Sequence, residues 1–167
     1  VGKNKSFLFN QNGQGKSALP DGMVSCITEC KDGVIITLNN GILAKLSSKN
    51  HKVEWINKYL LTLHQGALMN HSTYMDSYGN IWVSYLGNTV VWSSKSKKWY
   101  NSVPQIIKEL GIKYEGNNNV LVKDLVTDSK GNIWIATDHG GMLMLDVHNH
   151  ICESYKYDNT NTESIPD

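Results

Sequence analysis

The run GQGKS at residues 13–17 contains the glycine, lysine and hydroxyl groups with which some loops bind phosphate. Such a loop also needs a glycine five residues before the glycine that precedes the lysine, and a helix directly after it. In this chain Asn10 occupies that glycine position, and the turn-forming run PDG at residues 20–22 stands where the helix would begin. We therefore expect no nucleotide site.

Three histidines that are near one another in the sequence could supply nitrogen ligands to a metal ion. His148 and His150 are two residues apart and could share a strand face, and His139 precedes them. A pair of histidines across a turn is not a metal site without a third ligand that converges on the same point. We interpret these side chains as solvated turn residues and expect no metal.

Asp76 and Asp128 open loops that have some likeness to calcium-binding loops. Calcium loops alternate oxygen ligands along the chain. Tyr78 and Lys130 stand at the middle positions where such ligands would be needed. Turn capping therefore explains these aspartates better than calcium binding does.

Catalytic residues are not apparent in the sequence. A nucleophile needs a base and an orienting partner nearby, and no G-x-S-x-G nucleophile elbow is present. Paired carboxylates for glycoside chemistry would have to come from glutamates whose spacing shows no pattern. These glutamates are Glu29, Glu54, Glu109, Glu115 and Glu153. We expect that the chain is not an enzyme and uses no cofactor.

Length and charge narrow the remaining classes of protein. The 167 residues suit one domain, and 16 Lys and Arg against 15 Asp and Glu give a net charge of +1. The densest basic stretch is only Lys95–Lys98, which argues against a nucleic-acid partner. Apolar runs are far shorter than the roughly 18 residues that span a bilayer, so we expect no membrane contact by this segment. The chain opens with Val1 and is interpreted as a piece of something longer.

Three cysteines are present, and two of them lie in one predicted strand. Cys26 and Cys30 would be about 13 Å apart along that strand, so they cannot pair with each other. Buried thiols that behave as small hydrophobic side chains are the main interpretation. A bridge to Cys152 remains the alternative.

An internal repeat is the most informative feature of the chain. The segment DSYGNIWV at residues 76–83 recurs as DSKGNIWI at residues 128–135, an offset of 52 residues. A degenerate copy, KDGVIIT, lies at residues 31–37 and has isoleucine where tryptophan is expected. A second turn follows each copy, at residues 39–41, 86–88 and 138–141. Three units therefore share one plan.

Each unit consists of four short strands separated by turn residues. In the third unit the expected strands cover residues 122–127, 132–137, 142–147 and 151–157. Four-stranded units that repeat every 40 to 50 residues are typical of β-propeller blades. The predicted fold is all-β, a partial β-propeller of about three four-stranded blades.

We expect a single partial propeller over residues 1–167. The blades are placed at 22–56, 72–100 and 120–157, after the outer strand of a preceding blade with its connector at 1–21. Long connectors cover 57–71 and 101–119, and residues 158–167 lead to a missing blade. The second long connector contains a predicted helix that Ser102 caps and Gly111 ends.

The repeated residues have structural explanations. Aspartate accepts hydrogen bonds from nearby backbone amides, and glycine takes the positive φ of a tight turn. Tryptophan fills the space between neighbouring blades. The structural repeat residues are Asp76, Gly79, Trp82, Asp128, Gly131 and Trp134.

The repeat resembles that of the two-component regulator propeller family. The resemblance rests on the Asp-x-x-Gly-Asn-Ile-Trp motif, the glycine turn after it, and the connectors SALPD at 17–21 and SIPD at 164–167. It implies a periplasmic ligand-sensing module of a Bacteroides-type hybrid two-component system, which senses carbohydrate fragments and signals through a kinase outside this chain. The first copy departs from the pattern because it lacks the tryptophan, and the second has SYLG at residues 84–87.

Loop geometry places the ligand site independently of the motif. If the first strand of each blade is innermost, the turns after the second strands and the long connectors emerge on one face. The predicted ligand-binding residues on that face are Asn39, Asn40, Tyr85, Asn88, Asp138 and His139. The expected partners are an oligosaccharide and the rest of the propeller, or a second copy bound through exposed blade faces. A propeller enzyme such as a lyase and a protein-interaction scaffold remain alternatives.

Overall fold

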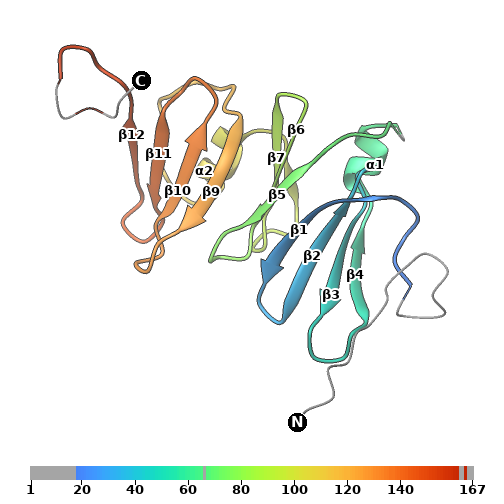
Figure 1. Cartoon of the computed structure of the whole chain (residues 1–167). Coiled ribbons are helices and arrows are strands. Elements are labelled where there is room, and N and C mark those ends of the chain that lie inside the picture. Colours follow the sequence, from blue (N-terminus) through green and yellow to red (C-terminus); the bar gives the residue numbers. More distant parts are fainter. Residues whose placement is uncertain (1–17, 66, 162–163, 165–167) are drawn as a thin grey trace, which may run out of the picture. The chain divides into compact units, whose positions relative to one another are not determined.

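The computed structural model describes residues 18–65, 67–161 and 164. Within these residues the chain forms three four-stranded antiparallel sheets and two short helices (Figure 1), as the prediction of about three four-stranded units requires. The chain divides into two compact units, residues 1–71 and 72–167. The strand expected before residue 18 lies outside the described residues, as do parts of the 158–167 connector.

The first unit contains one sheet, named blade 1, with the strand order β1-β2-β3-β4. Ile36, Leu38 and Ile42 are buried on one side of it, where Leu61 packs against them. Leu61 belongs to a one-turn helix in the connector that the sequence did not predict. The elements are β1 (Val24–Cys30), β2 (Gly33–Leu38), β3 (Leu43–Ser47), β4 (Val53–Asn57) and α1 (Tyr59–Leu63).

The second unit contains two sheets, named blade 2 and blade 3, with a helix between them in the sequence. Their strand orders are β5-β6-β7-β8 and β12-β11-β10-β9, so every strand pairs with its neighbour in the chain. Blade 2 comprises β5 (Ser72–Met75), β6 (Ile81–Tyr85), β7 (Asn88–Trp92) and β8 (Trp99–Tyr100). The helix is α2 (Val103–Glu109), and blade 3 comprises β9 (Val122–Thr127), β10 (Ile133–Thr137), β11 (Met142–Asp146) and β12 (Ile151–Tyr155).

Helix α2 starts after Ser102 and ends near Gly111, as predicted, but its cap differs from the prediction. Ser102 has an extended backbone at the N-cap, yet its hydroxyl makes no capping hydrogen bond. Instead, the Gln105 side chain reaches back and accepts a hydrogen bond from the Asn101 amide at 2.9 Å. Gly111 follows the last turn with φ +79°, a value that glycine adopts without strain.

Helix α2 helps to fill the core of the second unit. Val103, Ile106 and Ile107 are fully buried and belong to the same cluster as Trp82 of blade 2 and Ile133 of blade 3. Burying each such side chain contributes about 1.5–3 kcal/mol. The helix therefore joins blade 2 to blade 3 through one continuous core.

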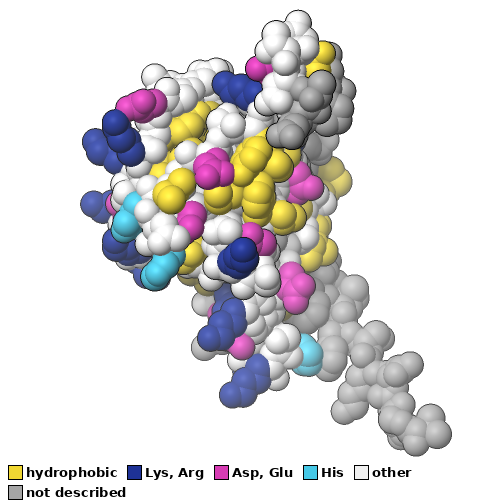
Figure 2. All heavy atoms as spheres, turned by 90° about the vertical axis from the view of Figure 1, so that its left-hand side faces the viewer, with side chains coloured by type: hydrophobic (Ala, Val, Ile, Leu, Met, Phe, Trp, Pro, Cys, Tyr) yellow, Lys and Arg dark blue, Asp and Glu magenta, His cyan; other side chains and the backbone are white. Residues whose placement is uncertain are grey.

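The two faces of blade 3 differ in burial. Register pairs Ile133 with Leu145 and Trp134 with Met144, so these pairs point to opposite faces. The Ile133 face lies in the core, whereas the Trp134 face is only partly covered. Hydrophobic side chains gather on the side of the molecule where β12 lies (Figure 2). An apolar blade face is therefore accessible.

Candidate functional site

The repeated aspartate organises a compact hydrogen-bond network in blade 2. Asp76 Oδ1 accepts bonds from the Tyr78 and Asn80 amides at 3.0 and 2.9 Å. Its Oδ2 accepts bonds from Asn80 Nδ2 and from Trp82 Nε1, both at 2.9 Å. The motif therefore links the turn to the buried tryptophan. The bonds from backbone amides were predicted from the sequence, whereas the bond from the Trp82 indole was not.

Blade 3 repeats the same network around Asp128. The Lys130 and Asn132 amides donate to Oδ1 at 2.9 Å, and Trp134 Nε1 donates to Oδ2 at 2.9 Å. The glycines of both turns have positive φ, +79° at Gly79 and +88° at Gly131, as the turn prediction requires. In each blade these residues hold the turn against the second strand, as the structural interpretation of the repeat predicts.

The pKa values of the two repeated aspartates are shifted in opposite directions. Burial raises the pKa of Asp76, although the hydrogen bonds from Trp82 and Asn80 oppose that rise. The hydrogen bond from Trp134, with those from Asn132 and Lys130, lowers the pKa of Asp128 to about 2. Asp128 is only half-buried, whereas Asp76 is buried. The same motif thus lies in two different solvent environments.

In the first unit, the predicted site residues bind the backbone around them. Asn39 is 8% exposed, and its Oδ1 accepts a hydrogen bond from the Met23 amide at 3.1 Å. Asn40 Nδ2 donates to the Asp21 carbonyl at 2.6 Å, and its Oδ1 accepts from the Ile42 amide at 3.1 Å. Both side-chain amides are therefore engaged in shaping the β2–β3 turn.

In blade 2, the predicted site residues flank a tight turn between β6 and β7. Leu86 and Gly87 form the turn with φ +39° and +76°. Asn88 is exposed, and its Nδ2 donates to the Leu86 carbonyl at 3.2 Å. Tyr85 is half-buried at the end of β6. None of these turn residues lines the cleft in blade 3.

The predicted residues of blade 3 line a cleft of about 370 Å³. Asp138 and His139 form one wall, and the connector between α2 and β9 forms another through Tyr114, Asn117 and Asn119. The remaining lining residues come from the same connector, from strands β10, β11 and β12 of blade 3, from the β10–β11 turn and from the residue after β12. They are Lys113, Glu115, Gly116, Val120, Thr137, Gly140, Leu143, Cys152, Ser154 and Lys156. The structure thus combines one predicted turn with one predicted connector.

The connector wall of the cleft is held by its own hydrogen bonds. Tyr114 donates its hydroxyl hydrogen to the Asn117 carbonyl at 3.1 Å, and Asn117 Oδ1 accepts from the Asn119 amide at 2.9 Å. Lys113 and Glu115 form an exposed ion pair at 2.6 Å. Burial raises the pKa of Tyr114 and of the Cys152 thiol. Both groups are therefore uncharged at neutral pH.

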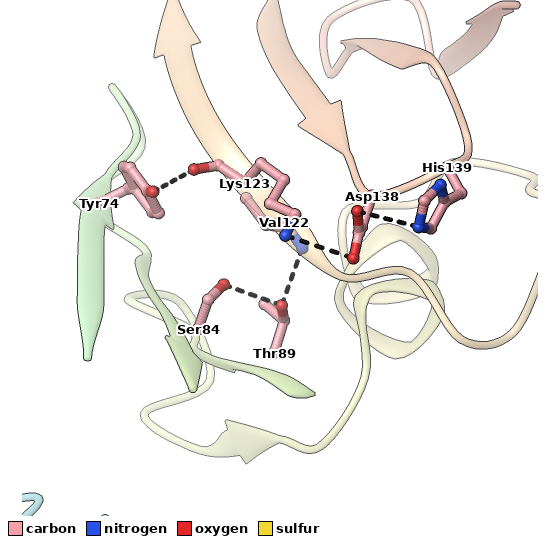
Figure 3. Close-up of polar contacts among 7 residues, drawn as sticks. All are labelled: Tyr74, Ser84, Thr89, Val122, Lys123, Asp138 and His139. Atoms are coloured by element: carbon pink, nitrogen blue, oxygen red, sulfur yellow. Dashed lines mark hydrogen bonds and ion pairs between the residues drawn. The ribbon is translucent and has the colours of Figure 1, made fainter. Parts of the chain in front are cut away.

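An ion pair that the sequence analysis missed lies at the Asp138 end of the cleft (Figure 3). Lys123 Nζ is 3.3 Å from Asp138 Oδ2, and His139 Nε2 is 3.6 Å from Asp138 Oδ1. Lys123 lies on β9 at a register irregularity, where Thr137 pairs with Val122 and Ala136 pairs with Asp124. The only sequence signal was the polar pair Lys123-Asp124 inside an apolar strand.

Among the described residues, no cluster of three or more His, Cys, Asp or Glu side chains could hold a metal ion. The three cysteines, which lie in this part of the chain, form no disulfide. No helix of the described segments is long and apolar enough to cross a membrane.

Sequence comparison identifies one repeat directly. Residues 114–139 match the two-component regulator propeller family. This segment contains the connector wall of the cleft, strand β9 and the Asp128–Trp134 motif. No curated protein sequence matches the chain.

Structural comparison supports the fold of the whole chain. The extracellular domain of a candidate hybrid two-component system from B. thetaiotaomicron is similar with a TM-score of 0.53 and 24% identity, over 94% of this chain and 19% of that one. The extracellular domain of a candidate one-component system from the same organism has a TM-score of 0.52 and 20% identity, over 88% and 18%. This chain therefore spans about a fifth of the length of those proteins.

Both neighbours are extracellular domains, one of a one-component system and one of a hybrid two-component system. At these identities the structural likeness establishes the fold, and the match to the family model covers the repeat at residues 114–139. The predicted partial propeller is confirmed, and the chain carries the repeat of the two-component regulator propeller family.

Proposed function

We propose that this chain is part of a ligand-sensing propeller module of a two-component receptor, and that its ligands are carbohydrate fragments. The observation that carries the proposal is the cleft beside Asp138 and His139. Its lining combines an aromatic ring, Tyr114, with amide and hydroxyl groups. Aromatic surfaces suit the apolar face of a sugar, and amide and carboxylate groups suit its hydroxyls.

The charge of the cleft is consistent with an uncharged ligand. Lys113 is paired with Glu115, and Asp138 is paired with Lys123. Lys156 is the remaining lysine of the lining. A neutral saccharide can bind such a surface without displacing a strongly charged group, whereas a polyanion would meet the carboxylates of Glu115 and Asp138.

Calorimetric titration with neutral oligosaccharides tests the proposal. The probes are cello-, xylo-, malto- and galacto-oligosaccharides, with oligogalacturonate as an acidic probe. Asn119→Ala changes an exposed cleft residue, and Asn50→Ala is the matched control in the exposed β3–β4 turn. We expect binding by at least one neutral probe, weakened about tenfold by Asn119→Ala and unchanged by Asn50→Ala. Failure of every probe would contradict the carbohydrate assignment.

We further propose that the accessible Trp134 face of blade 3 is covered by another blade, from the rest of the receptor or from a second copy. Val126 and Ile151 are 59% and 45% exposed, and Trp134 is half-buried. Apolar blade faces favour association because burial removes this surface from water. Light scattering over a concentration series should detect association, and a monomer at all concentrations would contradict self-association.

The extracellular neighbours support a location outside the cytoplasm for this chain. We place the module in the periplasm, as the extracytoplasmic part of an inner-membrane receptor. Fractionation of cells that express the full receptor would test this location. Recovery of the propeller from the cytoplasm would contradict it.

A further inference from the structure

Strand β9 carries a bulge that exposes two consecutive side chains. Val122 and Leu125 are buried, whereas Lys123 and Asp124 between them are exposed. The register skips Lys123, because Thr137 pairs with Val122 and Ala136 with Asp124. A bulge redirects a side chain that would otherwise alternate strictly between faces. Here it brings the Lys123 ammonium to the Asp138 carboxylate.

The Lys123–Asp138 pair is accessible and offers complementary groups. The side chains of Lys123 and Asp138 are 55% and 35% exposed. A carboxylate accepts hydrogen bonds from hydroxyl groups, and an ammonium donates them to hydroxyl oxygens. Hydrogen bonds that involve a charged group are stronger than those between neutral groups. Neighbouring hydroxyls of one sugar ring can therefore use both partners at once.

Blade 1 shows why the position in blade 3 is distinctive. The Asn39 amide donates to the Met23 carbonyl, just as the Asp138 amide donates to the Leu121 carbonyl. The two turns are thus built alike. The Asn39 side chain, however, accepts a hydrogen bond from the Met23 amide and is buried, whereas Asp138 lines the cleft and its carboxylate pairs with Lys123. The side chain at this turn position in blade 3 is therefore partly exposed instead of bound to the backbone of its own turn.

The residues beside Lys123 also bind blade 2 (Figure 3). The Val122 amide donates to Thr89 Oγ1 at 3.0 Å, and Thr89 Oγ1 shares a hydrogen bond of 2.9 Å with Ser84 Oγ. The Tyr74 hydroxyl donates to the carbonyl of Lys123 itself. The bulged strand therefore contacts Asp138, which lines the cleft, through Lys123, and it contacts the neighbouring blade through Val122 and the Lys123 carbonyl.

We propose that Asp138 and Lys123 anchor a vicinal diol of a neutral saccharide, and that Lys123 couples occupancy of the cleft to the hydrogen bonds between blades 2 and 3. The inference rests on the proposed function. Diol hydroxyls donate to the Asp138 carboxylate, and Lys123 donates to a hydroxyl oxygen. These bonds fix the Lys123 side chain, and with it the bulge whose backbone contacts Thr89 and Tyr74. Lys123 is thus a positioning residue for the signal as well as a ligand contact.

Hydrogen exchange combined with titration tests both halves of the proposal on the full chain. The probes are the neutral oligosaccharides and oligogalacturonate named above. We expect a saturating neutral probe to slow exchange of the Val122 amide, and Lys123→Met to abolish that slowing at saturation. Lys123→Met should weaken binding about tenfold, and Asp138→Asn at least tenfold, by loss of charged hydrogen bonds.

Two control variants separate coupling from general damage. Lys95→Met removes an exposed lysine in the β7–β8 turn and should change neither binding nor exchange. Lys123→Arg keeps the positive charge and should preserve most of the ligand-induced slowing at Val122. A purely structural role for Lys123 would alter exchange in the free protein but leave the slowing by ligand intact.

The outcomes distinguish this inference from the proposed function. If a neutral probe binds and still slows Val122 exchange in Lys123→Met, the coupling is overturned and the sensing function stands. If only oligogalacturonate binds, the neutral diol is overturned. If no probe binds the unmodified chain, the carbohydrate function and the anchor assignment fall together.

Discussion

The Asp76 network supports a direct comparison of two copies of one motif. Replacement of Asp76 by alanine removes the acceptor of four hydrogen bonds, three of which are buried. Trp82 is fully buried and Asn80 is 2% exposed, so water cannot replace the lost acceptor at their side chains. The matched change is Asp128→Ala, where none of the four bonds is buried.

The cost of Asp76→Ala follows from these buried donors. A buried donor left without a partner costs about 1 kcal/mol or more, so three give about 3 kcal/mol. Burial raises the pKa of Asp76, because the charged carboxylate is less stable in the buried site than in water. Removing the carboxylate also removes this desolvation cost, which offsets part of the loss of stability. We expect a net loss of about 2–3 kcal/mol of unfolding free energy. At about 1.5 kcal/mol per M of urea, the midpoint falls by about 1.3–2 M.

Urea unfolding followed by tryptophan fluorescence provides the assay. Four of the five tryptophans, all but Trp55, lie in the unit that contains both aspartates. Asp128→Ala should lower the midpoint clearly less, because water reaches its network. Equal shifts of the urea midpoint for the two variants would refute the reasoning. They would mean that the loss of stability comes from the turn itself and does not depend on how deeply its hydrogen bonds are buried.

Two further predictions concern stability. Burial, and then the neighbouring His64, lower the pKa of His71 to about 4, and the two rings stack at 5.2 Å. As the pH falls below 6.5, His71 is protonated in the unfolded chain but stays neutral in the folded one. The free energy of unfolding should therefore fall by up to about 3 kcal/mol between pH 6.5 and 4. A urea midpoint that stays constant over this range would contradict the prediction. In thermal melts, Gly141→Ala should destabilise the protein several times more than Gly87→Ala. The Cβ of an alanine at position 141 would collide with the Tyr155 carbonyl of the β11–β12 pair, whereas the space around Gly87 is open. The cost of Gly87→Ala is backbone strain alone, about 1–2 kcal/mol, and similar melts for the two variants would show that the collision is relieved without cost.

Much of the architecture could be predicted because a propeller blade is a local structure. The Asp-x-x-Gly turn, the strand that opens with tryptophan and the second glycine turn are all within about 20 residues of one another. Their periodicity identified the three four-stranded sheets, and the start and stop signals at Ser102 and Gly111 identified the helix between the second and third of them. The short helix α1 was missed because its five residues carry little helical periodicity of their own.

The site was predicted less completely, because residue type and turn position do not reveal which side chains are already engaged. Asn39, Asn40 and Asp138 occupy comparable turns, yet the two asparagines bind their own backbone and the aspartate faces a cleft. That difference depends on contacts between segments far apart in the sequence.

The sequence by itself determined the repeat, the family and the turns on which recognition groups could lie. These properties follow from local turn chemistry and from strand periodicity. Only the tertiary structure decided that the connector before β9 forms the second wall of the cleft. It alone placed Lys123 beside Asp138, because a one-residue bulge shifts every later side chain to the other face of the strand, and the pattern of residue types records that shift only faintly.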